Sequence, residues 1–291
     1  MKKYKYKMSY RYTIILFFLV SLISHTQSID LSIANRKQFV SVKSLPELNP
    51  NDISEKIILP EDTLVYIKQK FTSADLDYYC KCIENEEIAN SYYAFAFTKR
   101  QKGFQNDRVT QWNADIILFI DKKIPKNVQK DFKKFIKPIS NLKNLKINYS
   151  KDPLNSNYHI IASDTSLKIY KNDKDSLDIE HALSGATYQL ISDSNDKYYS
   201  AKLSLDIDAT QDSELLLKKM KQLFFLSLAQ FQIGSRNQND SLLSLDYNNS
   251  ENISSYDIAI LKLHYIRIHD YPFTKKDFST FYKKLKPLCS E

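Results

Sequence analysis

The chain has 291 residues, of which 43% are hydrophobic and 26% charged, with 3 glycines, 8 prolines and 3 cysteines. This length and hydrophobic fraction fit one large or two modest domains with a real core, and they exclude an intrinsically disordered protein. Three cysteines exclude a small scaffold built on disulfides. A mean hydropathy of -0.44 with one short apolar run excludes a multi-span membrane protein.

Residues 1–28 have the pattern of an export signal. Five basic residues come first, and residues 13–23 then form an apolar run of 11 residues. A membrane-spanning helix needs about 20 apolar residues, so this run is too short to span a bilayer. Thr26 and Ser28 place small side chains at positions −3 and −1, which predicts cleavage after Ser28. An uncleaved N-terminal tether is the alternative, and no cysteine follows the run to carry a lipoprotein anchor.

Removal of this signal changes the charge of the protein. The whole chain carries 42 basic and 34 acidic residues, a net charge of +8. The signal holds five of the basic residues and none of the acidic ones, so 37 basic and 34 acidic residues, net +3, remain. Basic and acidic residues alternate along the rest of the chain, whereas nucleic-acid binders concentrate basic residues on one surface. We therefore expect no nucleic-acid partner.

The three cysteines are Cys80, Cys82 and Cys289. An exported protein tolerates disulfides, so Cys289 could join the C-terminus to Cys80 or to Cys82, or all three thiols could stay reduced. The odd number leaves one thiol over in every case. A Cys-x-Cys pair can bind a metal, but zinc sites use wider spacings together with further Cys or His, which the local sequence lacks.

Residues 29–70 lack strong periodicity and contain turn signals before three prolines, so they predict an irregular N-terminal arm. Short strands are expected at residues 56–59 and 63–67. Ser73 then opens a helix, because apolar side chains recur at helical spacing on one face. That face consists of Leu76, Tyr79, Cys80 and Ile83.

Residues 115–120 are almost continuously apolar, which is typical of a strand buried on both faces. An amphipathic helix follows, with lysines on its polar side. Its apolar side consists of Val128, Phe132, Phe135, Ile136 and Ile139. Short strands are expected at residues 145–147 and 158–162. This order of strand, helix, strand and strand predicts helices packed on a mixed sheet.

Gly185 begins a predicted hairpin with strands at residues 187–192 and 199–207, joined by the turn residues 194–196. The longest predicted helix, residues 213–232, is apolar nearly all round in its middle, so we expect it at the centre of the domain. Gly234 suits a left-handed cap at the C-terminus of this helix. A polar loop at residues 237–250, a helix through residues 255–263 and a last helix after the capping box that Thr274 opens complete the chain.

This order of elements resembles that of an exported bacterial family of zincin-like proteins, related in fold to metallopeptidases. Three marks of that family match the first half of the pattern: Trp112 before the apolar strand, Asn157 directly before a later strand, and Gly185 at the start of the hairpin. The resemblance extends over roughly residues 75–285. It implies a zincin-like α+β domain, with a mixed β-sheet and packed helices, over residues 71–291.

Three further marks match the second half of the pattern. The central helix is followed by Ile233 and Gly234, where the family has Leu-Gly. An Asp-Ser-hydrophobic motif follows at residues 240–243. A helix motif at residues 256–265 has Asp257 in its second position and His264 where the family has Leu. The order and spacing of these marks carry the resemblance more than any single one does.

The metal site of the family is missing from this chain. Active zincins hold zinc with two histidines at i and i+4 on the central helix, and a glutamate beside the first histidine polarises the metal-bound water. Counting back from Gly234 places Ser227 and Phe231 at the histidine positions and Leu228 at that of the glutamate. The methionine turn of the family is replaced by residues 270–273. None of these side chains can bind zinc or act as the base.

The histidines offer no clear replacement. His264 and His269 are close in sequence, but five residues on a helix place them on different faces. His181 lies beside Glu180 and Asp178, which is either a weak metal cluster or, more simply, a solvated acidic loop. His159 lies in an apolar strand, where a hydrogen-bonded structural histidine is the simpler interpretation. No glycine-rich phosphate loop or G-x-S-x-G motif is present.

The chain contains 20 tyrosines, including adjacent pairs at residues 78–79, 92–93 and 198–199. Tyrosine-rich surfaces bind glycans or proteins, because the ring supplies apolar area with a polar tip. Adjacent tyrosines on strands also simply fill both faces of a sheet. Both interpretations stay open at this level.

The sequence therefore predicts an exported protein, periplasmic or extracellular, with a zincin-like α+β domain and no membrane span after cleavage. We expect no catalytic, metal-binding or cofactor-binding residues and no cofactor. The expected role is a non-catalytic binding or structural module whose partner is another envelope or extracellular protein or a glycan. The alternatives are a metallopeptidase or other hydrolase with a non-standard site, and an ordinary secreted α/β domain to which the resemblance does not apply.

Overall fold

The computed structural model describes residues 39–44, 53–67, 73–97, 99–101, 104–105, 107–164, 167, 185–234, 238–269 and 272–289. The chain divides into two compact units, residues 1–75 and residues 76–291. The predicted export signal and its cleavage site lie outside the described residues. In the part of the chain that is described, no helix is long and apolar enough to cross a bilayer.

The first unit contains a three-stranded antiparallel sheet in the order β1-β3-β2. Its strands are β1 (Phe39–Ser41), β2 (Ile53–Ile58) and β3 (Thr63–Ile67). The two predicted strands are thus confirmed, although β2 begins three residues earlier than expected. The predicted irregular arm is a small sheet in its described part.

The second unit is built on a seven-stranded mixed sheet in the order β12-β13-β11-β8-β10-β9, with β7 pairing with β13. The four central strands pair with one another in parallel, in the order β13, β11, β8 and β10. At the two edges, β12 pairs antiparallel with β13 and β9 pairs antiparallel with β10. Mixed pairing together with packed helices confirms the α+β class. The strands are β7 (Gln111–Trp112), β8 (Ile116–Ile120), β9 (Asn141–Leu142), β10 (Leu145–Ser150), β11 (Tyr158–Ala162), β12 (Ala186–Ser192) and β13 (Lys197–Leu205).

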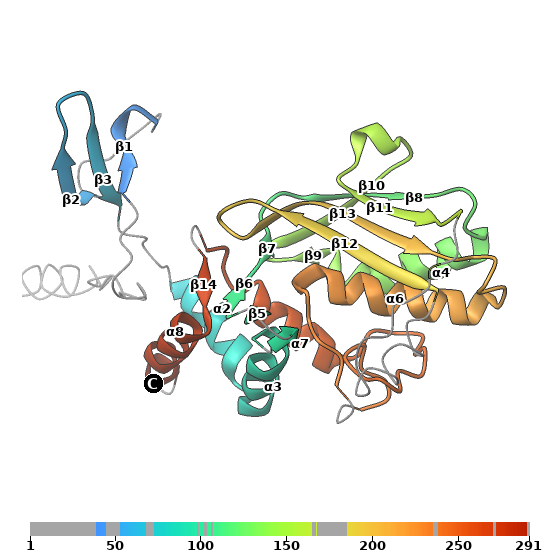
Figure 1. The fold of residues 1–291 in the computed structure, drawn as a ribbon. Helices are drawn as coiled ribbons and strands as arrows, with labels where there is room; N and C mark the ends of the chain where they lie inside the picture. Colours follow the sequence, from blue (N-terminus) through green and yellow to red (C-terminus); the bar gives the residue numbers. More distant parts are fainter. Residues whose placement is uncertain are drawn as a thin grey trace, which may run out of the picture. The chain divides into compact units, whose positions relative to one another are not determined.

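Two helices, α4 (Lys126–Ile136) and α6 (Ser213–Ala229), lie together on one face of this sheet (Figure 1). Aromatic rings join the two layers. The ring centroid of Phe224 on α6 is 5.2 Å from that of Phe132 on α4 and 5.1 Å from that of Tyr158 on β11. These contacts place the core of the unit between the sheet and α6.

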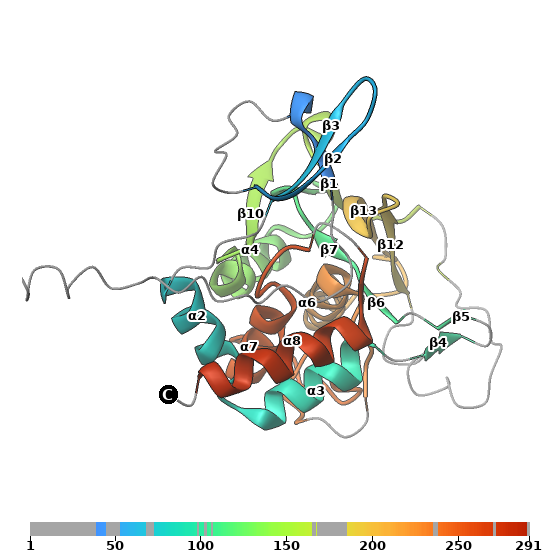
Figure 2. The same cartoon turned by 90° about the vertical axis from the view of Figure 1, so that its left-hand side faces the viewer.

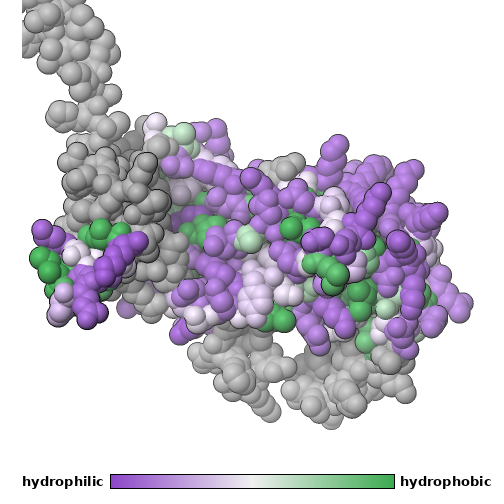
Figure 3. Space-filling model, turned by 90° about the horizontal axis from the view of Figure 1, so that it is seen from above, coloured by the Kyte–Doolittle hydropathy of each residue, from purple (hydrophilic) through white to green (hydrophobic). Residues whose placement is uncertain are grey.

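The prediction that residues 115–120 are buried on both faces is wrong. Ile116 and Leu118 are 0% exposed, but Ile117 is 37% exposed on the opposite face of the sheet. Alternate side chains of a strand point to opposite faces, and here only one face is covered by α4 and α6. Seen from above, the other face is mainly hydrophilic with separate hydrophobic spots (Figure 3).

Four further helices form a cluster beyond the sheet, in which α3, α7 and α8 lie side by side (Figure 2). The helix predicted to open at Ser73 is confirmed, whereas α3 occupies a stretch in which no helix was predicted. The helices are α2 (Ser73–Ile83), α3 (Glu86–Ala96), α7 (Ser255–His264) and α8 (Lys275–Leu288). Short strand pairs flank them, namely β4 (Lys99–Gln101) with β5 (Phe104–Gln105) and β6 (Arg108–Val109) with β14 (Phe273–Thr274).

The disulfide of the protein joins α2 to the end of α8. Cys80 is bonded to Cys289, and Cys82 is a free, buried thiol. This outcome decides between the alternatives that the sequence left open. A ring contact between Tyr79 and Phe281, with centroids 5.9 Å apart, packs the same two helices together.

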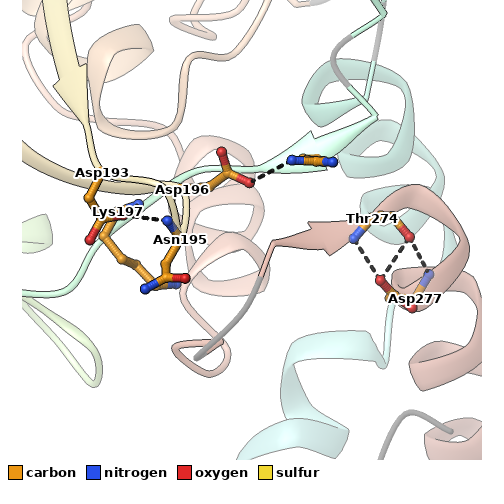
Figure 4. Close-up of polar contacts among 7 residues, drawn as sticks. Asp193, Asn195, Asp196, Lys197, Thr274 and Asp277 are labelled. Carbon is orange, nitrogen blue, oxygen red and sulfur yellow. Dashed lines mark hydrogen bonds and ion pairs between the residues drawn. The ribbon is translucent and has the colours of Figure 1, made fainter. Parts of the chain in front are cut away.

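Two predicted turn motifs are confirmed in detail (Figure 4). Before α8, the hydroxyl of Thr274 accepts the backbone N–H of Asp277, and the carboxylate of Asp277 accepts the backbone N–H of Thr274. In the β12–β13 hairpin, the Asp193 carboxylate accepts the backbone N–H groups of Asn195 and Lys197 at 2.8 and 2.9 Å. Side chains that replace backbone partners in this way fix the start of a helix and the register of a hairpin.

Gly185 has the positive φ that its position before the hairpin requires. Its φ is +77°, and a Cβ at this position would lie 3.2 Å from the Thr210 hydroxyl. Its carbonyl accepts the backbone N–H of Asp206 at 2.7 Å. A larger residue would therefore meet both backbone strain and a close contact.

The central helix ends earlier than predicted, and its cap is a different residue. Asp212 caps its start, but α6 ends at Ala229 with Gln230 in the left-handed conformation at φ 51°. Gly234 is not the cap. Its backbone N–H donates to the Leu243 carbonyl at 2.8 Å, and it forms a bridge with Ser244.

Part of the polar loop predicted between α6 and α7 lies in the core. Leu242, Leu243 and Tyr247 are 0% exposed. The buried amide of Gln222 on α6 donates to the carbonyls of Leu242 and Ser244 at 3.1 and 2.7 Å. Directly before the apolar middle of the helix, this amide binds the loop and satisfies backbone groups that would otherwise be buried at a cost.

Candidate functional site

The three positions that correspond to the metal site of the resemblance lie at the C-terminal end of α6. Ser227 and Leu228 are 0% exposed and Phe231 is 3% exposed. The helix lies beside the edge strand β12 and beneath the sheet (Figure 1). The helix therefore lies at the centre of the domain, as predicted. The side chains of these three residues determine what chemistry is possible at its end.

Ser227 is fully engaged inside the core. Its hydroxyl donates to the Phe224 carbonyl at 2.6 Å, as a helical serine commonly does. The single hydroxyl hydrogen is thereby used, so the Tyr158 hydroxyl donates to the Ser227 oxygen, 2.6 Å away. Burial raises the pKa of Tyr158, which keeps this pair neutral.

Phe231 fills the position of the second ligand with an aromatic ring packed on other rings. Its centroid is 5.4 Å from that of His264, 5.7 Å from that of Phe225 and 6.3 Å from that of Tyr92. Such edge-to-face and tilted contacts stabilise a core beyond the area that they bury. The position that the resemblance assigns to the second ligand thus holds an aromatic ring packed in the core.

Leu228 contributes a hydrogen bond through its backbone carbonyl. Its carbonyl lies near the end of α6, where helical partners are missing, and it accepts the Tyr265 hydroxyl at 2.5 Å. The Tyr265 oxygen in turn accepts the backbone N–H of Trp112 at 3.4 Å. Burial raises the pKa of Tyr265, so this hydroxyl stays a donor. Residues from α6, α7 and β7 are thereby joined at one point.

His264 is a structural histidine. Its Nε2 lies 3.0 Å from the Thr110 carbonyl, which can only accept, so Nε2 carries the hydrogen. Its Nδ1 then accepts from the Tyr92 hydroxyl, 3.4 Å away. Both ring nitrogens face protein groups at the end of α7, and the side chain is 2% exposed. His264 therefore has no nitrogen directed at a ligand.

The geometry expected for His264 and His269 is wrong, because α7 ends at His264. His269 lies beyond the helix, where its backbone N–H donates to the Gln111 side chain at 3.1 Å and its ring stacks on Phe273 with centroids 3.5 Å apart. Burial, with the positive charges of Arg267 and Lys197, holds the pKa of His269 well below its usual value. The two histidines lie near the same amide but do not form a ligand pair.

Gln111 holds this region together, and no pattern in the sequence marks it except its place next to Trp112. Its side chain is 0% exposed. Its amide nitrogen donates to the carbonyls of His264 and Arg267 at 2.6 and 2.9 Å. Its amide oxygen accepts from the backbone of His269 and, at 3.4 Å, from the Lys197 ammonium. One glutamine thus satisfies the chain where it leaves α7.

Two further histidines were considered from the sequence, His159 and His181. His159 on β11 is half-buried, and its Nε2 lies 2.7 Å from the Ser156 hydroxyl and 3.0 Å from the Pro153 carbonyl. These contacts fit the structural role that the sequence favoured. His181, with Glu180 and Asp178, lies outside the described residues. Within the described ranges, no group of three or more His, Cys, Asp or Glu side chains could hold a metal ion.

Two motifs of the resemblance meet in space. The Ser241 hydroxyl donates to one oxygen of the Asp257 carboxylate at 2.7 Å, and the backbone N–H of Leu242 donates to the other at 2.9 Å. Asp257 is 0% exposed, and burial raises its pKa to about 6. The Asp-Ser motif and the α7 motif therefore act as one structural joint between the loop and the helix.

Asn157 is also structural. Its side-chain oxygen accepts the backbone N–H of Ile117 at 2.7 Å, and its side-chain nitrogen donates to the Asp115 carbonyl at 2.9 Å. It joins the start of β11 to the start of β8 where the two parallel strands begin. Trp112 packs nearby on Tyr158 and Tyr198, with centroids 6.0 and 5.9 Å apart.

The tyrosine pairs are divided between helices and a strand. Residues 78–79 lie on α2 and residues 92–93 on α3, so the expectation of paired tyrosines on strands holds only for residues 198–199 on β13. On that strand Tyr198 is 2% exposed and Tyr199 is 55% exposed. Most of this aromatic surface is internal packing.

Two lysines on α6 are buried as well. The Lys221 ammonium donates to the Asn249 side chain at 3.0 Å and to the Ser250 carbonyl at 2.9 Å, and it lies 4.5 Å from the centroid of the Phe135 ring. Burial lowers the pKa of Lys221 to about 8. Lys219 donates to the Thr210 hydroxyl at 3.3 Å. Both ammonium groups bind loops around α6.

Comparison of the chain with protein-family models, curated proteins and solved structures finds no match. The functional argument therefore rests on the residues themselves.

Proposed function

We propose that the chain is an exported, non-catalytic binding or structural module of the bacterial envelope with a degenerate zincin-like fold. One observation carries the proposal. The end of α6, where such a fold would hold its metal, is filled by Ser227, Leu228 and Phe231, each at most 3% exposed and in contact with other core groups. Chemistry at that position needs ligands and access for water, and these residues supply neither.

The arrangement of elements supports the zincin-like part of the proposal. Strand β8, helix α4, strands β10 and β11, the β12–β13 hairpin and helix α6 follow one another in the order on which the resemblance rests. Helix α6 packs beside the edge strand β12.

The disulfide supports export. Cys80–Cys289 joins two segments 209 residues apart in the chain. Disulfides of this kind persist in oxidising compartments and are rare where thiols are kept reduced. Together with the basic and apolar pattern of residues 1–28, this favours a periplasmic or extracellular location.

Metal analysis of the purified protein, residues 29–291, tests the absence of catalysis. We expect no stoichiometric zinc after dialysis against micromolar zinc, and no change in thermal stability when a chelator is added. One tightly bound zinc per chain that is lost in His181→Ala or His264→Ala would instead establish the hydrolase alternative. His159→Ala serves as the matched histidine control.

Export is tested separately. Residues 1–28 fused to an alkaline phosphatase that folds only in an oxidising compartment should give an active enzyme, with cleavage after Ser28 found by N-terminal sequencing. Replacement of residues 15 and 19 by Arg should abolish activity, because charge in the apolar run blocks insertion. An inactive wild-type fusion would refute export.

A further inference from the structure

Positive charge is concentrated in one short part of the chain. Residues 122–151 contain ten lysines and one acidic residue, Asp131, which gives a net charge of +9. The rest of residues 29–291 holds 27 basic and 33 acidic residues, a net charge of −6. The even mixing of basic and acidic residues expected from the sequence therefore does not hold for this segment. All ten lysines are exposed, namely Lys122, Lys123, Lys126, Lys130, Lys133, Lys134, Lys137, Lys143, Lys146 and Lys151.

Five of these lysines form a row along α4 and the 3-10 turn Lys137–Ile139 that follows it. Positions 126, 130, 133, 134 and 137 recur at helical spacing, so their side chains share about 100° of the helix circumference, and the row is about 16 Å long. The opposite side of α4 is buried, and its Phe132 ring meets Phe224 of α6. We call this row of five residues the lysine face.

Few carboxylates neutralise the lysine face. Lys134 forms an ion pair with Glu251 at 2.5 Å. In the part of the chain that the structure describes, Lys126, Lys130 and Lys137 form no ion pair and no side-chain hydrogen bond. Exposed charges of one sign that lack nearby counter-charges create a field that attracts a partner of the opposite sign.

The residue types favour a broad anionic surface over a single bound anion. Every basic residue of residues 122–151 is Lys. Arg would form bidentate bonds to individual phosphates and stack on bases, whereas Lys acts as a hydrated point charge on a flexible stem. An exposed helix side is also convex, so it contacts a plane of charges more readily than it encloses a small ligand. Lysine-rich faces of amphipathic helices bind anionic lipid surfaces in this way.

Tyr149 adds an aromatic ring beside the lysine face. The ring belongs to β10, the side chain is 45% exposed, and the Lys133 ammonium lies 5.1 Å from the ring centroid. Tyrosine is enriched at the level of lipid head groups, because its ring is apolar and its hydroxyl polar. A single exposed ring gives no platform for the successive bases of a nucleic-acid strand. The ring therefore fits a lipid surface better than a nucleic acid.

We propose that the lysine face, with Tyr149, binds the surface of an anionic phospholipid bilayer. The inference rests on the proposed role as an exported binding module of the envelope, and it names the partner of that module. The net charge of −6 on the rest of residues 29–291 is repelled by the same surface. The protein therefore binds in one orientation, with α4 toward the lipid.

Co-sedimentation of residues 29–291 with lipid vesicles tests the proposal. At about 0.1 M salt, vesicles of equal parts phosphatidylglycerol and phosphatidylcholine should bind the protein, and vesicles of phosphatidylcholine alone should bind it about tenfold more weakly or less. Salt at about 1 M should release the protein, because the screening length falls from about 10 Å to about 3 Å. No binding to the anionic vesicles, or equal binding to both kinds, would overturn the inference.

Two triple variants locate the binding face. The test variant combines Lys126→Gln, Lys130→Gln and Lys137→Gln. It should bind the anionic vesicles about a hundredfold more weakly, because each lysine near such a surface contributes about fivefold. The control removes the same charge from exposed lysines of α7 and α8, with Lys262→Gln, Lys276→Gln and Lys283→Gln. It should lose less than about fivefold. Equal losses in both variants would refute the lysine face.

Two other partners of the lysine face give different results. Tighter binding to a DNA duplex than to the anionic vesicles, at the same salt, would assign the face to a polyanionic chain and overturn the proposal. A second copy of the chain, through its net negative remainder, is the other candidate. A salt-sensitive dimer in analytical ultracentrifugation, absent in the test variant and unable to bind the vesicles, would show that the second copy covers the face.

This proposal and the proposed function fail in distinguishable ways. A protein that is exported and free of zinc but binds no anionic vesicles refutes the lysine face and leaves the proposed function standing. A tightly bound zinc, or an inactive export fusion, refutes the proposed function. Binding to the anionic vesicles that is lost in the test variant would still establish the lysine face in that case.

Discussion

The two sides of helix α3 face regions of similar residue composition, but one region is buried and the other is open to solvent. On the inner side, Tyr92 meets His264 and the end of α6, where amides, hydroxyls and imidazoles bond to one another and to backbone groups. On the outer side, Ser91 and Asn90 line a groove open to solvent. The residue types are nearly the same. Their burial decides whether they hold the core together or stay in contact with solvent.

Electrostatics sharpens the contrast. Burial raises the pKa of Tyr92 and lowers that of His269, so both side chains stay neutral near pH 7. The polar groups around the end of α6 thus bond to one another and to backbone groups, and they hold this part of the fold together.

The largest expected effect comes from the disulfide that holds the cluster on which both regions depend. Cys289→Ser should lower the free energy of unfolding by about 4–5 kcal/mol, because the bridge closes a loop of roughly 200 residues in the unfolded chain. Chemical denaturation measures the change. Cys82→Ala, which removes only a buried free thiol, is the control. Equal losses in both variants would show that the bridge does not clamp the cluster.

The sealed end of α6 is tested next, with two leucines on the same helix. Leu228→Ala should cost about 3–4 kcal/mol, because Leu228 is 0% exposed and truncation leaves a cavity. Leu215→Ala should change stability by less than about 1 kcal/mol, because Leu215 is 39% exposed. Thermal unfolding measures both. Similar small losses would mean that the end of α6 is not packed as described.

The smallest effect concerns Asp257, which joins α7 to the preceding loop. Its folded-state pKa of about 6 lies above the usual 3.8, so the folded protein holds this proton more tightly than the unfolded chain does. The carboxyl therefore contributes most stability below about pH 4 and loses about 2–3 kcal/mol of it as the pH rises through 6. Unfolding free energies of wild type minus Asp257→Asn between pH 4 and pH 7 measure this loss. Parallel profiles would contradict the raised pKa.

Local patterns predicted much of the fold. The apolar periodicity of residues 126–136 predicted α4, the turn residues 194–196 predicted the β12–β13 hairpin, and Thr274 with Asp277 predicted the start of α8. Each of these signals is complete within a few residues of chain. The helix α3 was missed, because its apolar face depends on packing against α7 and α8 rather than on a strong pattern of its own.

For the candidate site, the sequence predicted only that the central helix lacks zinc ligands. Counting along α6 identified Ser227, Leu228 and Phe231 as residues without zinc-binding side chains, and the structure places all three in the core. The sequence could not predict the amide of Gln111 or the joint between Ser241 and Asp257, since each connects segments far apart in the chain. It also gave no indication of the groove, whose walls are 160 or more residues apart in places.

The sequence alone determined the element order, the class of fold, the absence of zinc ligands on the central helix and the number of thiols available for a bridge. Tertiary structure decided that Cys80 rather than Cys82 pairs with Cys289, that α6 ends at Ala229 with Gln230 rather than Gly234 as its cap, and which polar residues are buried or exposed. The reason is the range of the forces. Helix and turn signals act between neighbours in the chain, whereas burial and pairing depend on groups that only the folded chain brings together.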